Sequence, residues 1–203
     1  GFDSQAIAGW NGPGPYKIAN NTLAGAGENI MFGGADPAIP GLIPSDIEIR
    51  RNHIVTPIAW KGVWTRKNLF ELKNARRVLL EGNVLEGSWG DAQVGYAVIL
   101  KSANQAGKCP WCSTSDVTIR NNVFRNVGAG LNLAGREGSN KNPVDSLLRR
   151  VTIEHNVMTD VRIAPYTGEG RLIQLLEGVS DVIIRQSTFV STGEINAFLS
   201  LSR

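Results

Sequence analysis

Two stretches of the chain decide its fold: Val117-Thr-Ile-Arg-Asn-Asn122-Val-Phe124 and Val151-Thr-Ile-Glu-His-Asn156-Val-Met158. In both, apolar and polar residues alternate, an asparagine follows, and an apolar residue stands two positions after it. Segments 16–23, 47–54, 78–85 and 182–189 fit the same pattern, the last with serine in place of asparagine. The aligned positions are Asn21, Asn52, Asn83, Asn122, Asn156 and Ser187, at intervals of 31, 31, 39, 34 and 31 residues. Such a period is typical of a repeat fold.

A second apolar run lies between successive asparagine motifs. These runs are 29–34, 69–74, 96–101, 130–135, 172–177 and 197–201, with 3–10 as one more. Most alternate with period two, which indicates strands, and no sustained period of 3.6 indicates a helix. A unit with three short strands predicts one coil of a β-solenoid, and the chain holds about six such units.

The repeated asparagines predict an internal ladder. A side-chain amide both donates and accepts, so each asparagine can bond to the asparagines of the coils above and below it. Asparagine also tolerates the left-handed backbone that a bend requires. We therefore interpret these residues as structural, and we expect a single β-helix domain over residues 1–203.

Composition excludes several classes of protein. Of 203 residues, 42% are hydrophobic and 19% charged, which is a globular composition. No run of 18 apolar residues is present, so we expect no membrane partner. The net charge of +3 is small and scattered, unlike the dense cationic stripe of a nucleic-acid-binding protein, and we expect no nucleic-acid partner.

The repeats resemble those of right-handed parallel β-helix proteins, the pectate-lyase-like superfamily, over almost the whole chain. The resemblance implies an all-β fold of three parallel sheets. The second apolar runs would form the sheet called PB1, the segments before each asparagine PB2, and the short runs after it PB3. It also implies a secreted, extracellular bacterial protein that binds or processes polysaccharide on the outer face of PB1.

Solenoids need polar caps, because open ends expose strand edges. The chain opens and closes in apparent PB1 runs, so we expect it to be part of a longer protein. Exposed edges also predict self-association through the ends of the solenoid.

Period two sorts the residues of PB1 into inward and outward ones. The predicted outer row is Met31, Glu71, Val98, Asn132 and Gln174, and the residues at the strand ends are Lys73, Lys101, Arg136 and Glu177. We take Glu71, Lys73, Lys101 and Arg136 as catalytic candidates. Asn132, Gln174 and Glu177 are candidates for substrate binding, because amides and charged groups bond to sugar hydroxyls and carboxylates.

The spacing of the carboxylates favours one cleavage chemistry over another. A polysaccharide lyase needs a base and a cation that neutralises a uronate carboxyl group. A hydrolase needs two carboxylates across the scissile bond, whereas Glu71 and Glu177 would lie three coils, or about 14 Å, apart. We therefore expect lyase-type chemistry rather than hydrolysis, if the protein is an enzyme.

Tryptophans on the connecting segments supply further candidates. Trp60, Trp64 and Trp89 lie outside the predicted strands, and flat aromatic rings suit stacking on sugars. We expect them to bind substrate. An incomplete row of acids and amides before the PB1 runs makes calcium a candidate ion, while the metal itself stays unknown. That row is Asp3, Gln5, Glu28, Asp91 and Gln93.

Two alternatives stay open. An elongated solenoid also suits a non-catalytic adhesin, spacer or assembly module. The two cysteines, in Cys109-Pro-Trp-Cys112, could form a small structural disulfide, a redox pair or half of a zinc site.

Overall fold

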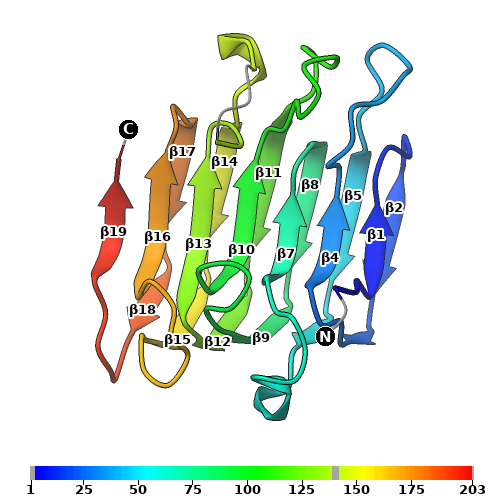
Figure 1. The fold of residues 1–203 in the computed structure, drawn as a ribbon. Helices are drawn as coiled ribbons and strands as arrows, with labels where there is room; N and C mark the ends of the chain where they lie inside the picture. Colours follow the sequence, from blue (N-terminus) through cyan, green and yellow to red (C-terminus); the bar gives the residue numbers. More distant parts are fainter. Residues whose placement is uncertain (1–2, 139–141, 203) are drawn as a thin grey trace.

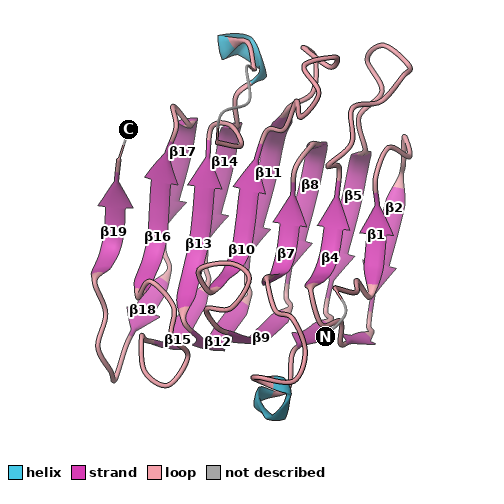
Figure 2. Ribbon diagram, viewed as in Figure 1, coloured by secondary structure: helices cyan, strands magenta, loops and turns pink. Residues whose placement is uncertain are grey.

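The protein is a right-handed parallel β-helix with three stacked sheets (Figure 1). The structure, a computed structural model, describes residues 3–138 and 142–202. Within those residues the only helical segments are two short 3-10 turns, η1 (Ile58–Trp60) and η2 (Val144–Ser146), which both lie outside the stack of strands (Figure 2). The predicted fold class is confirmed.

The three sheets follow the three segments of the repeat. PB1 consists of β1 (Ile7–Gly9), β4 (Glu28–Phe32), β7 (Asn68–Leu72), β10 (Tyr96–Lys101), β13 (Ala129–Ala134), β16 (Arg171–Leu176) and β19 (Ala197–Leu201). PB2 consists of β2 (Tyr16–Ala19), β5 (Ser45–Arg50), β8 (Ala75–Glu81), β11 (Thr114–Arg120), β14 (Arg149–Glu154) and β17 (Ser180–Arg185). PB3 consists of β3 (Thr22–Leu23), β6 (His53–Val55), β9 (Val84–Ser88), β12 (Val123–Val127), β15 (Val157–Val161) and β18 (Thr188–Val190).

The core lies between the sheets and is built from columns of aligned apolar side chains. In PB1, one such column pairs Ile30, Phe70, Val98, Leu131 and Ile173 in register, and all five are buried. Each coil thus places its inward residues directly on those of the next coil, at the strand spacing of about 4.8 Å. This stacking makes the outer faces equally regular.

The asparagine ladder is present and runs in one direction. The Oδ1 atom of Asn122 accepts from the backbone N of Asn83 at 2.9 Å and from its Nδ2 at 3.0 Å. In turn, Asn122 donates from its own backbone N and Nδ2 to Oδ1 of Asn156, both at 3.0 Å. The side-chain hydroxyl of Ser187 accepts from the backbone N of Asn156 at 3.1 Å and so continues the ladder.

The left-handed residue at this bend is the one before each ladder residue, not the asparagine itself. These residues are Asn20, Arg51, Gly82, Asn121, His155 and Gln186, with φ between 50° and 66°. The expectation that the ladder asparagines adopt left-handed torsions is therefore wrong. Their side chains instead bond between coils.

The cysteine pair forms a disulfide between Cys109 and Cys112, and both residues are fully buried. It closes a tight turn in the segment that connects β10 to β11. Within that segment Asn104 accepts from the backbone N of Cys109 at 2.9 Å. Of the three interpretations of this motif, the structure supports the small structural disulfide.

We expect Asn122→Ala to lower the free energy of unfolding by about 3–5 kcal/mol, because it leaves two donors of Asn83 and one buried carbonyl, that of Leu80, without partners. Asn21→Ala is the matched control: this residue is exposed and ends the ladder, so its loss should cost about 1 kcal/mol or less. Urea denaturation measures both. Equal destabilisation by the two substitutions would show that the buried ladder bonds do not stabilise the stack of coils.

Candidate functional site

A shallow groove of about 320 Å³ lies on the outer face of PB1, over β10, β13 and the end of β16. Four predicted site residues line it, namely Lys101, Asn132, Arg136 and Glu177. The lining residues that sequence reasoning missed include Tyr96, Ile99, Glu137 and Leu176. Its volume lies at the lower end of the range of about 300–1,000 Å³ for small-ligand sites.

The register of β10 corrects one position of the predicted outer row. Ile99, and not Val98, pairs with Glu71 on one side and with Asn132 on the other. Val98 pairs with the inward Phe70 and is fully buried, so its outward assignment is wrong. The run Tyr96-Ala-Val-Ile-Leu-Lys101 is apolar at almost every position, so it carries no alternation from which the inward residues could be read.

Glu71, Lys101 and Glu137 form a cluster at one end of the groove. The Nζ atom of Lys101 lies 2.9 Å from Oε1 of Glu71 and 2.5 Å from Oε1 of Glu137. Glu71 has the register of the predicted outer row but is fully buried, so it is not exposed on the sheet face. The physical reason is that neighbouring side chains cover it: Asn68 donates to Glu71 at 3.0 Å and to Gln93, from the 89–95 loop, at 3.1 Å.

The charges of this cluster keep Lys101 protonated. Burial alone would lower the pKa of Lys101, but the charges of Glu71 and Glu137 outweigh burial and raise it. Burial likewise acts to raise the pKa of Glu137, and the charge of Lys101 outweighs it and lowers that pKa. Lys101 and Glu137 are therefore placed to be charged near neutral pH, and Lys101 is the cation that lies against the buried Glu71.

The other predicted cations lie at the edges of the groove. Arg136 pairs with Glu177 through Nε and Oε2 at 3.2 Å, and both side chains are partly exposed at the mouth. Lys73 is half-buried and is not among the lining residues, although its charge contributes to the lowered pKa of Glu137. The structure thus brings together Lys101 and Glu71, and Arg136 and Glu177, as two separate pairs.

A chain of hydrogen-bonded side chains forms the floor of the groove. The Nδ2 atom of Asn132 donates to Oε1 of Gln174 at 2.9 Å. The hydroxyl of Tyr96 lies 2.7 Å from the same Oε1 and 3.0 Å from Oε2 of Glu169. Burial raises the pKa of Tyr96, so this hydroxyl stays protonated and donates. Gln174 is itself buried, and Tyr96 and Asn132 are the members of the chain that line the groove.

The tryptophans do not share this groove. Trp89 is 1% exposed and is therefore unavailable for stacking on a ligand, contrary to expectation. Trp60 and Trp64 line a separate depression of about 270 Å³ with Ser4, Ala24 and Ala26. The physical reason is that Trp89 directly follows β9 and its side chain is enclosed in the fold, while the loop around η1 projects below β7 in Figure 1.

The predicted row of acids before the PB1 strands is occupied by the chain's own donors. Lys67 pairs with Glu28 at 3.1 Å and also with Asp3, and Gln5 donates to Glu28 at 2.8 Å. Asp91 accepts from the backbone N of Arg66 at 2.8 Å. Across the described residues, no three histidine, cysteine or carboxylate side chains gather as a metal site would require. Calcium stays an untested prediction.

Comparisons with protein-family models, with curated proteins and with solved structures find no match to this chain. In the parts of the chain that the structure describes, no helix has the length and apolar character needed to cross a membrane.

We expect Lys101→Met to lower the free energy of unfolding by about 3–5 kcal/mol, because it leaves the buried carboxylate of Glu71 without a counter-charge. Adding Glu71→Gln should recover about half of that loss or more, since the remaining amide carries no charge. Lys73→Met, the same change at a half-buried lysine outside the groove, should cost less than about 1 kcal/mol. Thermal or urea denaturation of the wild type, the two single variants and the double variant measures these differences in stability. A double variant that is less stable than Lys101→Met would contradict the pairing of Lys101 with Glu71.

Proposed function

We propose that this protein binds a polysaccharide along the outer face of PB1, in the groove lined by Lys101, Asn132 and Arg136. The observation that supports this most is the mixture of side chains on one open surface. Amide and charged groups there can bond to sugar hydroxyls, and Ile99 and Leu176 offer apolar surface for the faces of sugar rings. A groove that crosses stacked strands also suits a linear polymer.

The balance of charge in the groove favours a neutral glycan. Lys101 and Arg136 are each paired with a carboxylate of the same chain, Glu137 and Glu177 respectively. A uronate carboxylate would have to compete with those partners and would meet their negative charge. The hydroxyls of a neutral sugar can instead donate to the carboxylates and accept from the cations without breaking either pair.

The same charges favour binding over cleavage. A lyase needs a proton acceptor, but Lys101 is held protonated by its two carboxylates. A hydrolase needs a protonated carboxylic acid, but the pKa of Glu137 is lowered and its carboxylate stays ionised. We therefore propose binding as the main function, and lyase-type cleavage, with or without calcium, should be assayed beside it.

The disulfide supports an extracellular location, because disulfides persist in oxidising compartments. The alternative function, a non-catalytic structural or adhesin module, is favoured by a different observation. The charged groups named above already have partners within the chain, as expected for a scaffold that needs no ligand.

We expect a glycan array to show binding to neutral polysaccharides, and Arg136→Ala and Asn132→Ala each to weaken the affinity by about tenfold, the loss of one good hydrogen bond. The array includes acidic polysaccharides with and without calcium, and absorbance reports any new unsaturated chain ends.

Arg125→Ala is the matched control, because this arginine is also partly exposed and paired, with Glu86 at 2.9 Å on PB3. It should leave the affinity unchanged. Absence of binding to any glycan would favour the structural module. Binding that is lost in Trp64→Ala but kept in Arg136→Ala would move the site to the depression beside η1.

A further inference from the structure

The outer face of PB2 carries two rows of charges whose sign alternates from coil to coil. At the start of the strands the row is Asp46, Arg77, Asp116, Arg150 and Asp181, in five successive coils. At the end of the same strands the row is Arg50, Glu81, Arg120, Glu154 and Arg185. Each strand from β5 to β17 therefore carries opposite charges at its two ends, and the order reverses in the next coil.

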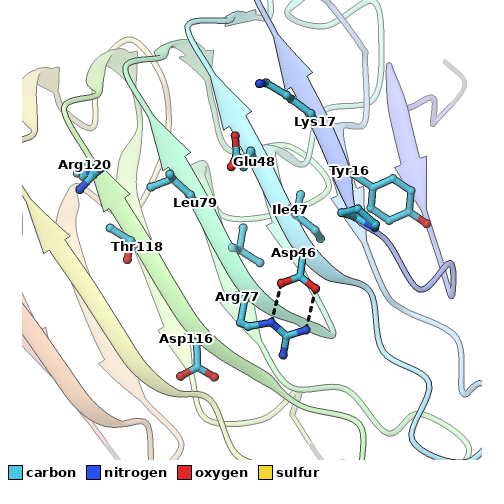
Figure 3. A pocket seen from close by; sticks show the side chains of 12 residues that line it. Tyr16, Lys17, Asp46, Ile47, Glu48, Arg77, Leu79, Asp116, Thr118 and Arg120 are labelled. Atoms are coloured by element: carbon cyan, nitrogen blue, oxygen red, sulfur yellow. Dashed lines mark hydrogen bonds and ion pairs between the residues drawn. The ribbon is translucent and has the colours of Figure 1, made fainter.

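Ion pairs along each row hold the charges in place. Arg77 donates from two nitrogens to Asp46 at 2.7 and 2.8 Å, as Figure 3 shows, and Arg150 bonds to Asp116 in the same way at 2.6 and 2.8 Å. The hydrogen bonds from Arg150 lower the pKa of Asp116 to about 2, so this carboxylate is ionised throughout the neutral range. In the second row Arg120 bonds to Glu81 at 2.6 Å.

The strip between the two rows is less polar. In successive coils it contains Lys17, Glu48, Leu79, Thr118, Thr152 and Ile183. Figure 3 shows Glu48, Leu79 and Thr118 side by side in this strip, on the floor of a hollow of about 640 Å³. The face is open to solvent: the side chains of Asp46 and Arg77 are 53% and 57% exposed. The two rows and the strip between them contain six acidic and six basic residues, whose charges balance.

This pattern is complementary to itself under one simple symmetry operation. A two-fold axis parallel to the stack of coils, placed between two copies, lays each PB2 strand antiparallel over the same strand of the partner. The start of every strand then faces the end of its counterpart, so Asp46 meets the partner's Arg50 and Arg77 meets the partner's Glu81. Because the signs alternate in both rows, all five charged strands meet opposite charges at both ends.

We propose that a second copy of this chain docks on the outer face of PB2, forming a side-by-side dimer with parallel solenoid axes. Such an isologous contact closes on itself and stops at two copies. Every residue of the central strip would meet its own counterpart across the axis. Leu79 and Ile183 would bring apolar surfaces together, whereas Lys17 and Glu48, in the first two coils, would meet like charges; Glu48 is paired with Arg50 of its own chain at 3.1 Å. This contact differs from end-to-end stacking, because it uses a face of the solenoid and leaves both ends and the PB1 groove free.

The size of the face predicts a weak and salt-sensitive dimer. Five strands at about 4.8 Å spacing and about 20 Å in length cover about 500 Å² on each copy, or about 1,000 Å² in total. That area is the lower limit for a specific interface, so we expect a dissociation constant weaker than about 1 µM. Raising the salt from about 0.1 M to about 1 M shortens the screening length from about 10 Å to about 3 Å, and should weaken the dimer about tenfold or more.

Sedimentation equilibrium from about 1 µM to about 500 µM spans the affinity expected for this area. In 0.1 M salt the mass should rise with concentration from 21.9 kDa toward twice that value, and it should fall back in 1 M salt. The deciding variant is the double swap Asp46→Arg with Arg77→Asp. It keeps the pair within the chain, so the fold and its melting temperature should be retained. Between copies it sets the introduced arginine against Arg50 and the introduced aspartate against Glu81, so the dimer should be lost.

The matched control exchanges an ion pair on another sheet, Glu86→Arg with Arg125→Glu on PB3, and should leave the dimer intact. A protein that stays monomeric at every concentration in 0.1 M salt would overturn the proposal. So would association that survives the PB2 swap, or assembly that continues beyond two copies, as end-to-end stacking would produce. The protein could instead stay monomeric and bind to a polyanion column, with the PB2 swap abolishing that binding. This result would indicate that the face binds an acidic polymer and not a second copy.

Discussion

The hydrogen bonds of the asparagine ladder are the constraint on which the rest of this structure depends. Each ladder amide joins two coils at the same corner, so every coil turns at the same point and starts its next strand in the same register. Because the ladder residues from Asn52 to Asn156 are buried, an unmet bond there would cost a large part of the stability of a domain of this size. The regular outer faces of PB1 and PB2 follow from this stacking.

The fold could be predicted because its signal repeats. Six copies of one pattern carry the ladder, and the strands on either side of it follow from period two. Where a strand is apolar at nearly every position, the prediction of which residues face inward failed. In β10 nearly every residue is apolar, so Val98 and Ile99 could not be sorted, and only the pairing with the neighbouring strands decides which of them faces the core. The left-handed residue beside each ladder position was misplaced by one, because a local preference does not show which residue absorbs the bend.

The candidate groove was predicted only in part. Asn132 was found because the alternation of its strand is readable, and Lys101, Arg136 and Glu177 because they are charged residues at strand ends. Glu137 could have been found as a carboxylate beside a strand end. The burial of Glu71 and Trp89 could not have been predicted from the sequence. Both depend on how the 89–95 loop folds over the sheet, and the sequence of a loop does not fix its path. The charge alternation on PB2 is readable from the aligned repeats, because its residues stand at equivalent positions of successive coils.

The proposed function requires that the ligand binds on the outer face of PB1. Hydrogen–deuterium exchange, with and without the neutral glycan that binds best, can locate the ligand because it reports on every segment at once. We predict slower exchange confined to β10, β13 and residues 135–138, with PB2 and the loop around η1 unchanged. Protection at the η1 loop or on PB2, with none on PB1, would contradict binding at this face.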